Sequence, residues 1–314
     1  MYLSVAFQSV DPGLGRLDYA SLSQQALMEM LVEGFKCTDQ VFPRACKRYG
    51  PTDISRWTGL EIDQSTGDVL EISWDRMYLG GTLHVDWLPP SVKDIDMESN
   101  NIQGTLNLGM LPPLLESLVL SSNNFSGTIS LSLLPPMLRY LNLMGNHLSG
   151  SIDLRSLPEA MGSLQLGRNA FTGRIRLDKL PSSMKNIDLS QNAFDGSIRL
   201  DKLPDGIRSI TLSENRLSGS VDLCNLPDSL EFLLLDNNLL EGSLNLSSLP
   251  EFLRRLDLHK NKFSGSVKFG SIYETLQCLN ISENPLLTGT AKVARDNAHF
   301  ITKTHTKVRF RYME

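Results

Sequence analysis

Residues 180–202 read LPSSMKNIDLSQNAFDGSIRLDK, and residues 203–225 restate the pattern as LPDGIRSITLSENRLSGSVDLCN. In both stretches an asparagine follows the Leu-Pro dipeptide by twelve residues and a glycine follows it by sixteen. A chain of 314 residues could hold two domains by length alone. A fixed period indicates instead one solenoid of stacked coils. The dipeptide recurs every 23 residues, at Leu88, Leu111, Leu134, Leu157, Leu180, Leu203, Leu226 and Leu249.

Each unit contains two apolar residues with the spacing of a β-strand. In one unit they are Ile187 and Leu189, and in another they are Leu233 and Leu235. A period of two sends both side chains to one face of a strand. Stacked units are therefore predicted to form one parallel sheet of about ten strands.

The full unit reads L-P-x-x-L-x-x-L-x-L-x-x-N-x-L-x-G-x-I-x-L-x-x, and it resembles the leucine-rich repeat. Its tail, G-x-I-x-L, is similar to that of plant receptors and polygalacturonase inhibitors, and its Leu-Pro form to the repeat sets of kinetoplastid protists. The resemblance covers residues 65–289. It implies a mostly β, curved solenoid with a concave parallel β-sheet, and, on the convex side, a short second β-sheet and 3-10 turns. An N-terminal helical cap completes this prediction.

The constant spacing of the units also predicts structural roles for their asparagine, proline and glycine. The asparagine amide of each unit, such as Asn192, is expected to satisfy backbone groups of its own and the adjacent coil. Proline favours the first position of a helical turn, so Leu-Pro predicts such a turn on the outside of the coil. The glycine marks a backbone conformation that side chains resist. The alternating segment 196–200 after it predicts the second short strand.

The two flanks are expected to cover the ends of the solenoid. We divide the chain into an N-terminal helical cap at residues 1–64, a repeat solenoid of about ten units at 65–289, and a basic segment at 290–314. Apolar residues at helical spacing predict one helix over residues 17–35. Such a helix would shield the open edge of the first coil.

The C-terminal segment supports two interpretations. Residues 291–314 carry a charge of +4, which leaves −9 for the rest of a chain whose total is −5. The alternation of Val308, Phe310 and Tyr312 with basic residues predicts a strand. This strand either folds back over the last coil or forms a basic arm that joins a partner's sheet edge or an anionic surface. The arm residues are Lys303, Lys307, Arg309 and Arg311.

Composition and motifs exclude several classes of protein. An apolar content of 41% is sufficient for a core, so disorder is excluded. No apolar run could span a membrane, and the slightly acidic balance argues against nucleic-acid binding outside the C-terminal arm. Phosphate-loop, zinc-protease and serine-hydrolase motifs are absent, so we predict no enzyme and no cofactor. The first ten residues lack a signal-peptide pattern, which predicts an intracellular, cytoplasmic location.

The concave face is the predicted partner-binding surface, because its outward strand positions vary from unit to unit. The first coils present five carboxylates there. Oxygen ligands would suit Ca²⁺ or Mg²⁺, but strand spacing spreads these charges, so we predict no metal site. Later coils present apolar and basic side chains typical of binding hot spots. The candidate residues are Glu71, Asp75, Asp94, Asp96, Glu98, Tyr140, Met144, Phe232, Leu234, Arg255 and His259.

The sequence therefore predicts a protein–protein interaction scaffold whose protein partner it does not identify. One alternative is a structural subunit of a larger assembly, anchored by the basic arm. A second is a secreted or surface recognition receptor, and a third is a regulator of an enzyme. Cys37 and Cys46 have a spacing that permits pairing, but reduced thiols fit the intracellular prediction better.

Overall fold

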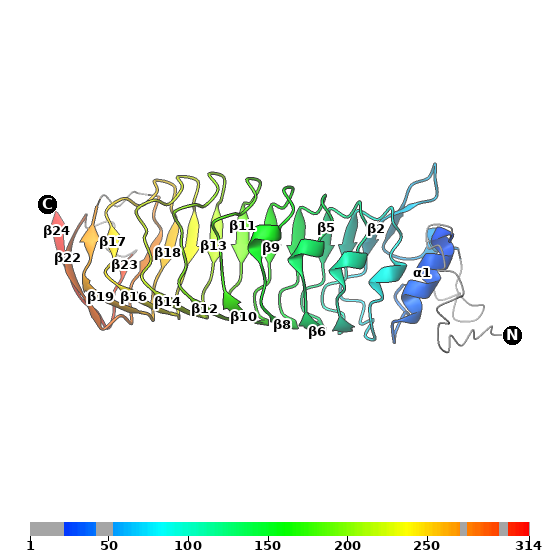
Figure 1. The fold of residues 1–314 in the computed structure, drawn as a ribbon, viewed down its shortest axis with the longest axis horizontal. Helices are drawn as coiled ribbons and strands as arrows, with labels where there is room; N and C mark the ends of the chain where they lie inside the picture. The colour runs from blue at the N-terminus through cyan, green and yellow to red at the C-terminus, as the bar shows by residue number, and fades with distance from the viewer. Residues whose placement is uncertain (1–21, 42–52, 271–274, 295–300, 314) are drawn as a thin grey trace.

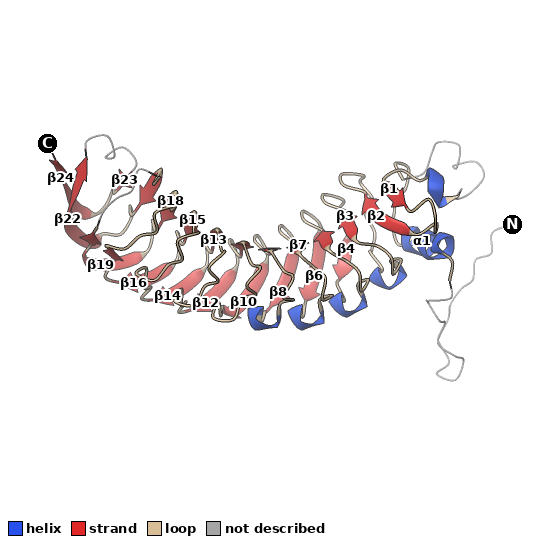
Figure 2. Cartoon of the chain, turned by 90° about the horizontal axis from the view of Figure 1, so that it is seen from above, coloured by secondary structure: helices blue, strands red, loops and turns tan. Residues whose placement is uncertain are grey.

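A computed structural model describes residues 22–41, 53–270, 275–294 and 301–313. The chain forms a curved solenoid of stacked coils (Figures 1 and 2). In the described residues, a sheet of 12 strands lines the inner side of the curve and a sheet of 10 strands lines the outer side. The predicted mostly β solenoid with a concave parallel sheet is confirmed.

The concave sheet takes one strand from each coil, in sequence order. Its strands pair in parallel, except for an antiparallel first pair. They are β1 (Leu60–Ile62), β2 (Val69–Ser73), β3 (Asp94–Asp96), β5 (Ser117–Val119), β7 (Tyr140–Asn142), β9 (Ser163–Gln165), β11 (Asn186–Asp188), β13 (Ser209–Thr211), β15 (Phe232–Leu234), β18 (Arg255–Asp257), β21 (Cys278–Asn280) and β23 (Ile301–Thr302).

The convex sheet takes a second strand from each coil. A short third sheet pairs β17 (Asn245–Leu246) with β20 (Lys268–Phe269). The convex strands are β4 (Gln103–Thr105), β6 (Asn124–Thr128), β8 (His147–Gly150), β10 (Ala170–Arg174), β12 (Ala193–Gly196), β14 (Arg216–Gly219), β16 (Leu239–Gly242), β19 (Lys262–Ser266), β22 (Leu286–Ala294) and β24 (Lys307–Met313).

The second strand lies earlier in the unit than the sequence analysis predicted. Strand β12 covers residues 193–196 and ends at the glycine that was expected to begin it. Within the described residues, the segment after the glycine forms strands in the two units of the third sheet and in the unit of Gly289, where β22 continues to Ala294. Alternation after the glycine reflects burial of Ile198 and Leu200 in the coil, which does not require a sheet partner.

The predicted 3-10 turns are present, but they lie at a different place in the unit. Short 3-10 helices precede Leu-Pro in four units, and in each the leucine is the residue that ends the helix. The proline instead opens a single turn, in which the Met184 amide donates to the Pro181 carbonyl at 3.0 Å. The 3-10 helices of these units are η4 (Val85–Trp87), η5 (Leu108–Met110), η6 (Leu131–Leu133) and η7 (Leu154–Ser156). A fifth, η3 (Ile54–Arg56), lies before the first coil.

The core is a set of apolar columns between the two sheets. Central strand residues such as Ile187 and Ile210 are almost completely buried. The phenylalanine rings of Phe171 and Phe194 stack with their centroids 6.2 Å apart. Each coil therefore buries its apolar residues against its two neighbours, which makes stability a sum of nearest-neighbour terms.

The asparagine column forms the predicted ladder. Asn215 donates to the carbonyl of Leu212 in its own coil at 3.1 Å and to that of Leu189 in the preceding coil at 3.0 Å. Its side-chain oxygen accepts the amide of Phe194, also in the preceding coil, at 3.1 Å. Each asparagine thus satisfies buried backbone groups of two coils.

The ladder explains why the first coil needs no asparagine. Met77 occupies that position, and among the described residues no coil precedes this one for an amide to reach. Asn100 of the next coil pairs the backbone groups of the first coil. Its side-chain oxygen accepts the Met77 amide at 2.8 Å, and its side-chain nitrogen donates to the Trp74 carbonyl at 2.6 Å.

The glycine column has the expected left-handed backbone. Gly196 has a φ of +74°, and a Cβ there would lie 3.1 Å from the Cγ of Arg174 in the preceding coil. The residue before each ladder asparagine is also left-handed, although it is usually not glycine, as at Gln191 and Glu214. Sequence analysis did not predict this second left-handed position.

The described part of the N-terminal cap is a helix and a hairpin. Helix α1 (Gln24–Glu33) is shorter than predicted; residues 17–21 lie outside the described residues. Ser23 caps it by accepting the Ala26 amide, and its buried face includes Met28 and Leu31. The helix packs on η4 of the first coil, and β1 pairs antiparallel with β2.

The described part of the C-terminal segment extends both sheets of the solenoid. Strand β23 continues the concave sheet beside β21, and β24 pairs with β22 in the convex sheet. Ile301 and Val308 are buried, and the Lys303 ammonium donates to the Val308 carbonyl at 2.8 Å. This is the folded-back arrangement of the two that the sequence allowed, with Lys307, Arg309 and Arg311 exposed on the last strand.

Two smaller findings concern thiols and membranes. Cys37, Cys224 and Cys278 are free thiols, and Cys46 lies outside the described residues. Within the described ranges, no helix has both the length and the apolar character needed to cross a bilayer.

Replacing Asn215 with alanine is expected to lower the free energy of unfolding by about 3 kcal/mol, because buried backbone groups of two coils lose partners. Urea unfolding monitored by circular dichroism measures the change. Asn186→Ala is the matched control, since Asn186 lies half-exposed on the concave face. Equal effects of the two substitutions would contradict the ladder's role.

Candidate partner-binding surface on the concave face

The concave surface is built from the outward positions of the inner strands. In β13 the central Ile210 is buried, while Ser209 and Thr211 on either side are half-exposed. The same alternation is present along most of the sheet. Equivalent positions in adjacent strands are therefore about 4.8 Å apart and form rows across the coils.

The predicted acidic residues lie together at the N-terminal end of this surface. Glu71 of β2 is paired in register with Asp94 of β3, and Asp96 follows on the same strand. Asp75 and Glu98 lie just after these two strands. One cation, Arg76, contacts both of these residues, at 3.7 Å from Asp75 and 3.1 Å from Glu98.

The two β3 carboxylates have perturbed pKa values. Partial burial and the negative charges of Glu71 and Glu116 raise the pKa of Asp94. Partial burial also raises the pKa of Asp96, with smaller contributions from Asp75 and Glu98. Both carboxylates are therefore less stable in their charged form than in water, which is the electrostatic condition that favours a cationic partner.

A second predicted group lies in the middle of the sheet. Tyr140 is half-buried in β7, and its hydroxyl is 3.5 Å from the amide nitrogen of Asn142. Met144 is half-buried two residues beyond the strand. This group adds adaptable apolar surface between the two ends.

The third group is the predicted hot spot in β15 and β18. Phe232 is 36% exposed, and it is paired in register with Arg255, whose side chain is 49% exposed. Leu234 lies half-exposed in the next row. An aromatic ring, an aliphatic chain and a guanidinium thus meet on one patch, which is the combination enriched at binding hot spots.

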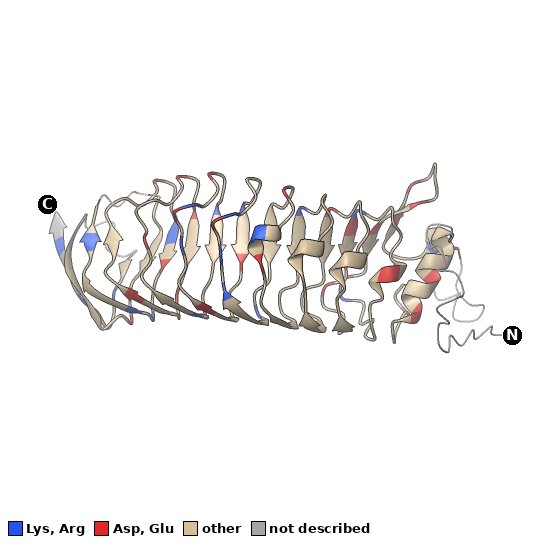
Figure 3. Cartoon of the chain, in the orientation of Figure 1, with Lys and Arg blue, Asp and Glu red and all other residues tan. Residues whose placement is uncertain are grey.

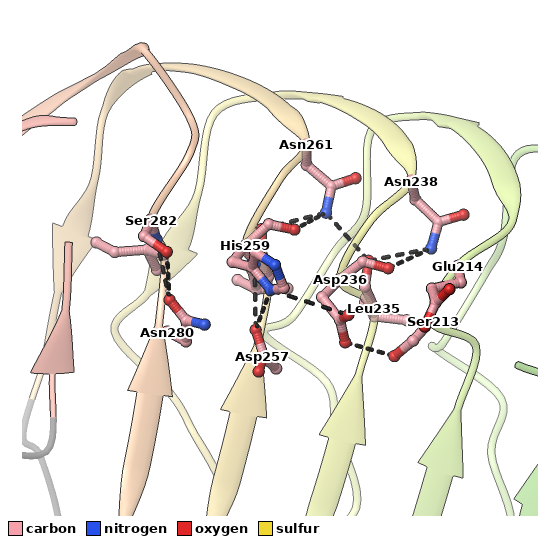
Figure 4. A network of polar contacts seen from close by, with 12 residues as sticks. Ser213, Glu214, Leu235, Asp236, Asn238, Asp257, His259, Asn261, Asn280 and Ser282 are labelled. Carbon is pink, nitrogen blue, oxygen red and sulfur yellow. Dashed lines mark hydrogen bonds and ion pairs between the residues drawn. The ribbon is translucent and has the colours of Figure 1, made fainter. Parts of the chain in front are cut away.

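A buried carboxylate holds this patch in place. Asp257 is 3% exposed; one oxygen accepts from Arg255 at 3.0 Å and the other contacts the His259 ring nitrogen at 3.1 Å. The same ring nitrogen lies 3.8 Å from Asp236, which accepts a hydrogen bond from Ser213. Figure 4 shows His259 between the two carboxylates.

Asp236, Asp257 and His259 are also the group in the described residues that could hold a metal ion. One ligand atom from each lies within 4.8 Å of the others, and mixed nitrogen and oxygen ligands suit zinc. The hydrogen bonds of Asp257 with Arg255 and His259, and of Asp236 with Ser213, give the group a structural role without a metal. The sequence analysis missed Asp236; its position two residues beyond β15, equivalent to His259 in the next coil, was the available signal.

The three groups do not form one pocket. Six strand steps separate β3 from β15, which is about 29 Å at the usual strand spacing. Only an extended or large partner could contact both ends.

Coil geometry, the asparagine ladder and the two sheets define the leucine-rich-repeat fold. A family profile described as "Leucine Rich repeat" matches residues 135–152. Among curated protein sequences, none matches. The chain therefore has the leucine-rich-repeat fold, and residues 135–152 match the profile of the repeat itself.

Solved structures with this fold include plant receptors and a plant ice-binding protein. The PEPR1–AtPEP1 structure has a TM-score of 0.68 at 23% identity, over 92% of this chain and 42% of that one. The ice-binding protein has a TM-score of 0.65 at 23% identity, over 92% and 94%. The ectodomain of the receptor kinase GASSHO1/SCHENGEN3 from Arabidopsis thaliana has a TM-score of 0.57 at 19% identity, over 91% and 42%. This chain thus spans less than half of either receptor chain.

Replacing Asp94 and Asp96 with asparagine is expected to stabilise the protein at pH 7. Their folded-state pKa values are raised above 3.8, so the folded state binds protons more readily than the unfolded state, and stability falls as pH rises through this range. The advantage of the double variant should disappear near pH 4, as the carboxylates become protonated.

Thermal melts of both proteins at pH 7 and pH 4 measure this difference. Asp188→Asn is the matched control, because Asp188 holds the equivalent strand position in β11. A double variant that melts below the parent protein at pH 7 would contradict the raised pKa values of the two carboxylates.

Proposed function

We propose that the protein is a non-enzymatic binding scaffold that takes an extended peptide or protein segment on its concave face. The single observation that carries the proposal is the Phe232, Leu234 and Arg255 patch. These side chains are exposed on a sheet, while Asp257 beneath them fixes the guanidinium and the His259 ring. A patch that is rigid before binding loses little conformational entropy when a ligand arrives.

The charges of the surface indicate the chemistry of the ligand. The acidic residues of β2 and β3 favour basic side chains at one end of the ligand, and Phe232 and Leu234 favour an apolar anchor at the other. A separation of about 29 Å corresponds to roughly nine residues of extended peptide. The GASSHO1/SCHENGEN3 ectodomain was solved in complex with CASPARIAN STRIP INTEGRITY FACTOR 2, which supports a protein or peptide ligand for this fold.

Ice binding, which is named for one solved neighbour, receives less support. The outward positions of the convex sheet include Asp195, Arg216, Glu241 and Lys262, all exposed. Charged side chains resist loss of water, so they do not suit adsorption to an ice lattice.

We also propose an intracellular location, which the free thiols of Cys37, Cys224 and Cys278 support.

Phe232→Ala is expected to weaken ligand binding by about tenfold or more without lowering the melting temperature, because the ring is partly exposed and lies at the centre of the patch. A random library of 15-residue peptides, displayed on phage and selected on the immobilised protein, supplies the ligands. Isothermal titration calorimetry on the selected peptides measures the affinities.

Phe252→Ala is the matched control, since Phe252 is 58% exposed but lies outside the concave strands. Selected peptides should combine basic residues with an aromatic or aliphatic anchor and should bind this control normally. Selection of no peptides, or equal binding to the two alanine variants, would overturn the proposal.

A further inference from the structure

A basic hollow lies on the convex side, away from the concave surface. It lies where the unit at residues 157–179 meets the next unit, and its volume is about 270 Å³. Figure 3 shows blue at the end of β10, which borders it. The residues that line it are Arg174, Ile175, Arg176, Leu177, Asp178, Ser197 and Arg199.

Arg174 departs from the pattern of the repeat at its position. The residue directly after the column glycine is otherwise a small hydroxyl residue in the units on both sides. Arg174 instead extends over the next coil, where its side chain lies close to Gly196. The other members of this column are Thr82, Thr105, Thr128, Ser151, Ser197, Ser220, Ser243 and Ser266.

Arg176 and Arg199 depart from a second column, three residues after the glycine. Short acceptors in this column accept a backbone amide two residues on, as Asp153 does at 3.1 Å and Asp222 at 2.9 Å. Arginine has no acceptor, so both units give up this local hydrogen bond. Other units carry His84, Lys268 and Lys292 three residues after their glycine, and the two lysines lie in strands, β20 and β22.

The charges of the hollow are only partly neutralised. Arg199 pairs with Asp201 through two hydrogen bonds, of 3.0 and 2.6 Å. Neither Arg174 nor Arg176 forms an ion pair with any described residue, although the exposed carboxylate of Asp178 also lines the hollow. Two arginines therefore keep all their donors available, with the Ser197 hydroxyl beside them.

A second surface hollow of the same volume shows the opposite arrangement. Its two arginines, Arg208 and Arg254, share Glu231 at 4.0 and 3.2 Å. Arginine-lined hollows in this solenoid can thus have every arginine paired, whereas in the hollow at Arg174 only Arg199 is paired.

We propose that the Arg174–Arg176–Arg199 hollow binds a tetrahedral oxyanion, the phosphate or sulfate group of a ligand. Guanidinium groups match such oxyanions with paired, charge-assisted hydrogen bonds. The three arginines replace, at one place, the residues that most units use one and three residues after the glycine. They therefore contribute less to the local structure of the coil than to a site that could bind a ligand. This site is independent of the peptide-binding function proposed for the concave face.

The test replaces the arginines with residues that other units carry in the same columns, as Ser197 and Asn107 do. Arg174→Ser with Arg176→Asn should weaken binding of inorganic phosphate and of inorganic sulfate by about tenfold, the effect of losing one charge-assisted hydrogen bond or more. The melting temperature should be unchanged or higher, because both replacements suit their columns. Titrations of the full chain, followed by NMR chemical shifts, compare phosphate with sulfate and so identify the preferred group.

Arg254→Ser in the neutralised hollow is the matched control and should leave anion binding unchanged. Arg174→Lys with Arg176→Lys keeps the charge and the fold but loses the paired geometry, and it should bind with intermediate affinity. Absence of phosphate and sulfate binding by the parent protein would overturn the proposal. Binding that is equal in the parent, the serine–asparagine variant and the lysine variant would also overturn it.

Discussion

The hydrogen bonds of the asparagine ladder are the constraint on which the solenoid depends. The turn after each concave strand removes backbone amides and carbonyls from water, and those groups would be costly if left unpaired. Asn215 and its equivalents pair them across two coils at once. Because the ladder fixes the distance between coils, it also fixes the register of both sheets and of the apolar columns between them.

This constraint separates residues that hold the coil from residues that are free to vary. Ile210 and the ladder asparagines leave little choice, whereas Ser209 and Thr211 face outward and could be exchanged. The proposed binding residues occupy such free positions, as Phe232 and Arg255 do on the concave side. Arg174 and Arg176 are different, because they replace residues that neighbouring coils use for local structure.

Sequence periodicity predicted much of the fold and little of the site. It located the concave strands, the ladder and the glycine turns because each depends on one residue type at a fixed interval. It misplaced the second strand and the helical turns, because Ile198 and Leu200 are buried whether or not their backbone joins a sheet. Periodicity did not identify Asp236 as a site residue. Its proximity to His259 depends on side-chain directions in adjacent coils, and spacing along the chain does not define those directions.

The ladder has a direction, and this matters during synthesis on the ribosome. Each asparagine completes the coil before it, so a coil that has just emerged still carries unpaired amides until the next 23 residues follow. A growing chain therefore always exposes one incomplete coil at its newest end. After the coil of Asn284, β23 and β24 continue the two sheets with a strand pair in place of another asparagine. The amides of Ile281 and Glu283 in that coil donate to the carbonyls of Thr302 and Thr304, so this segment pairs backbone groups that a growing chain would leave open.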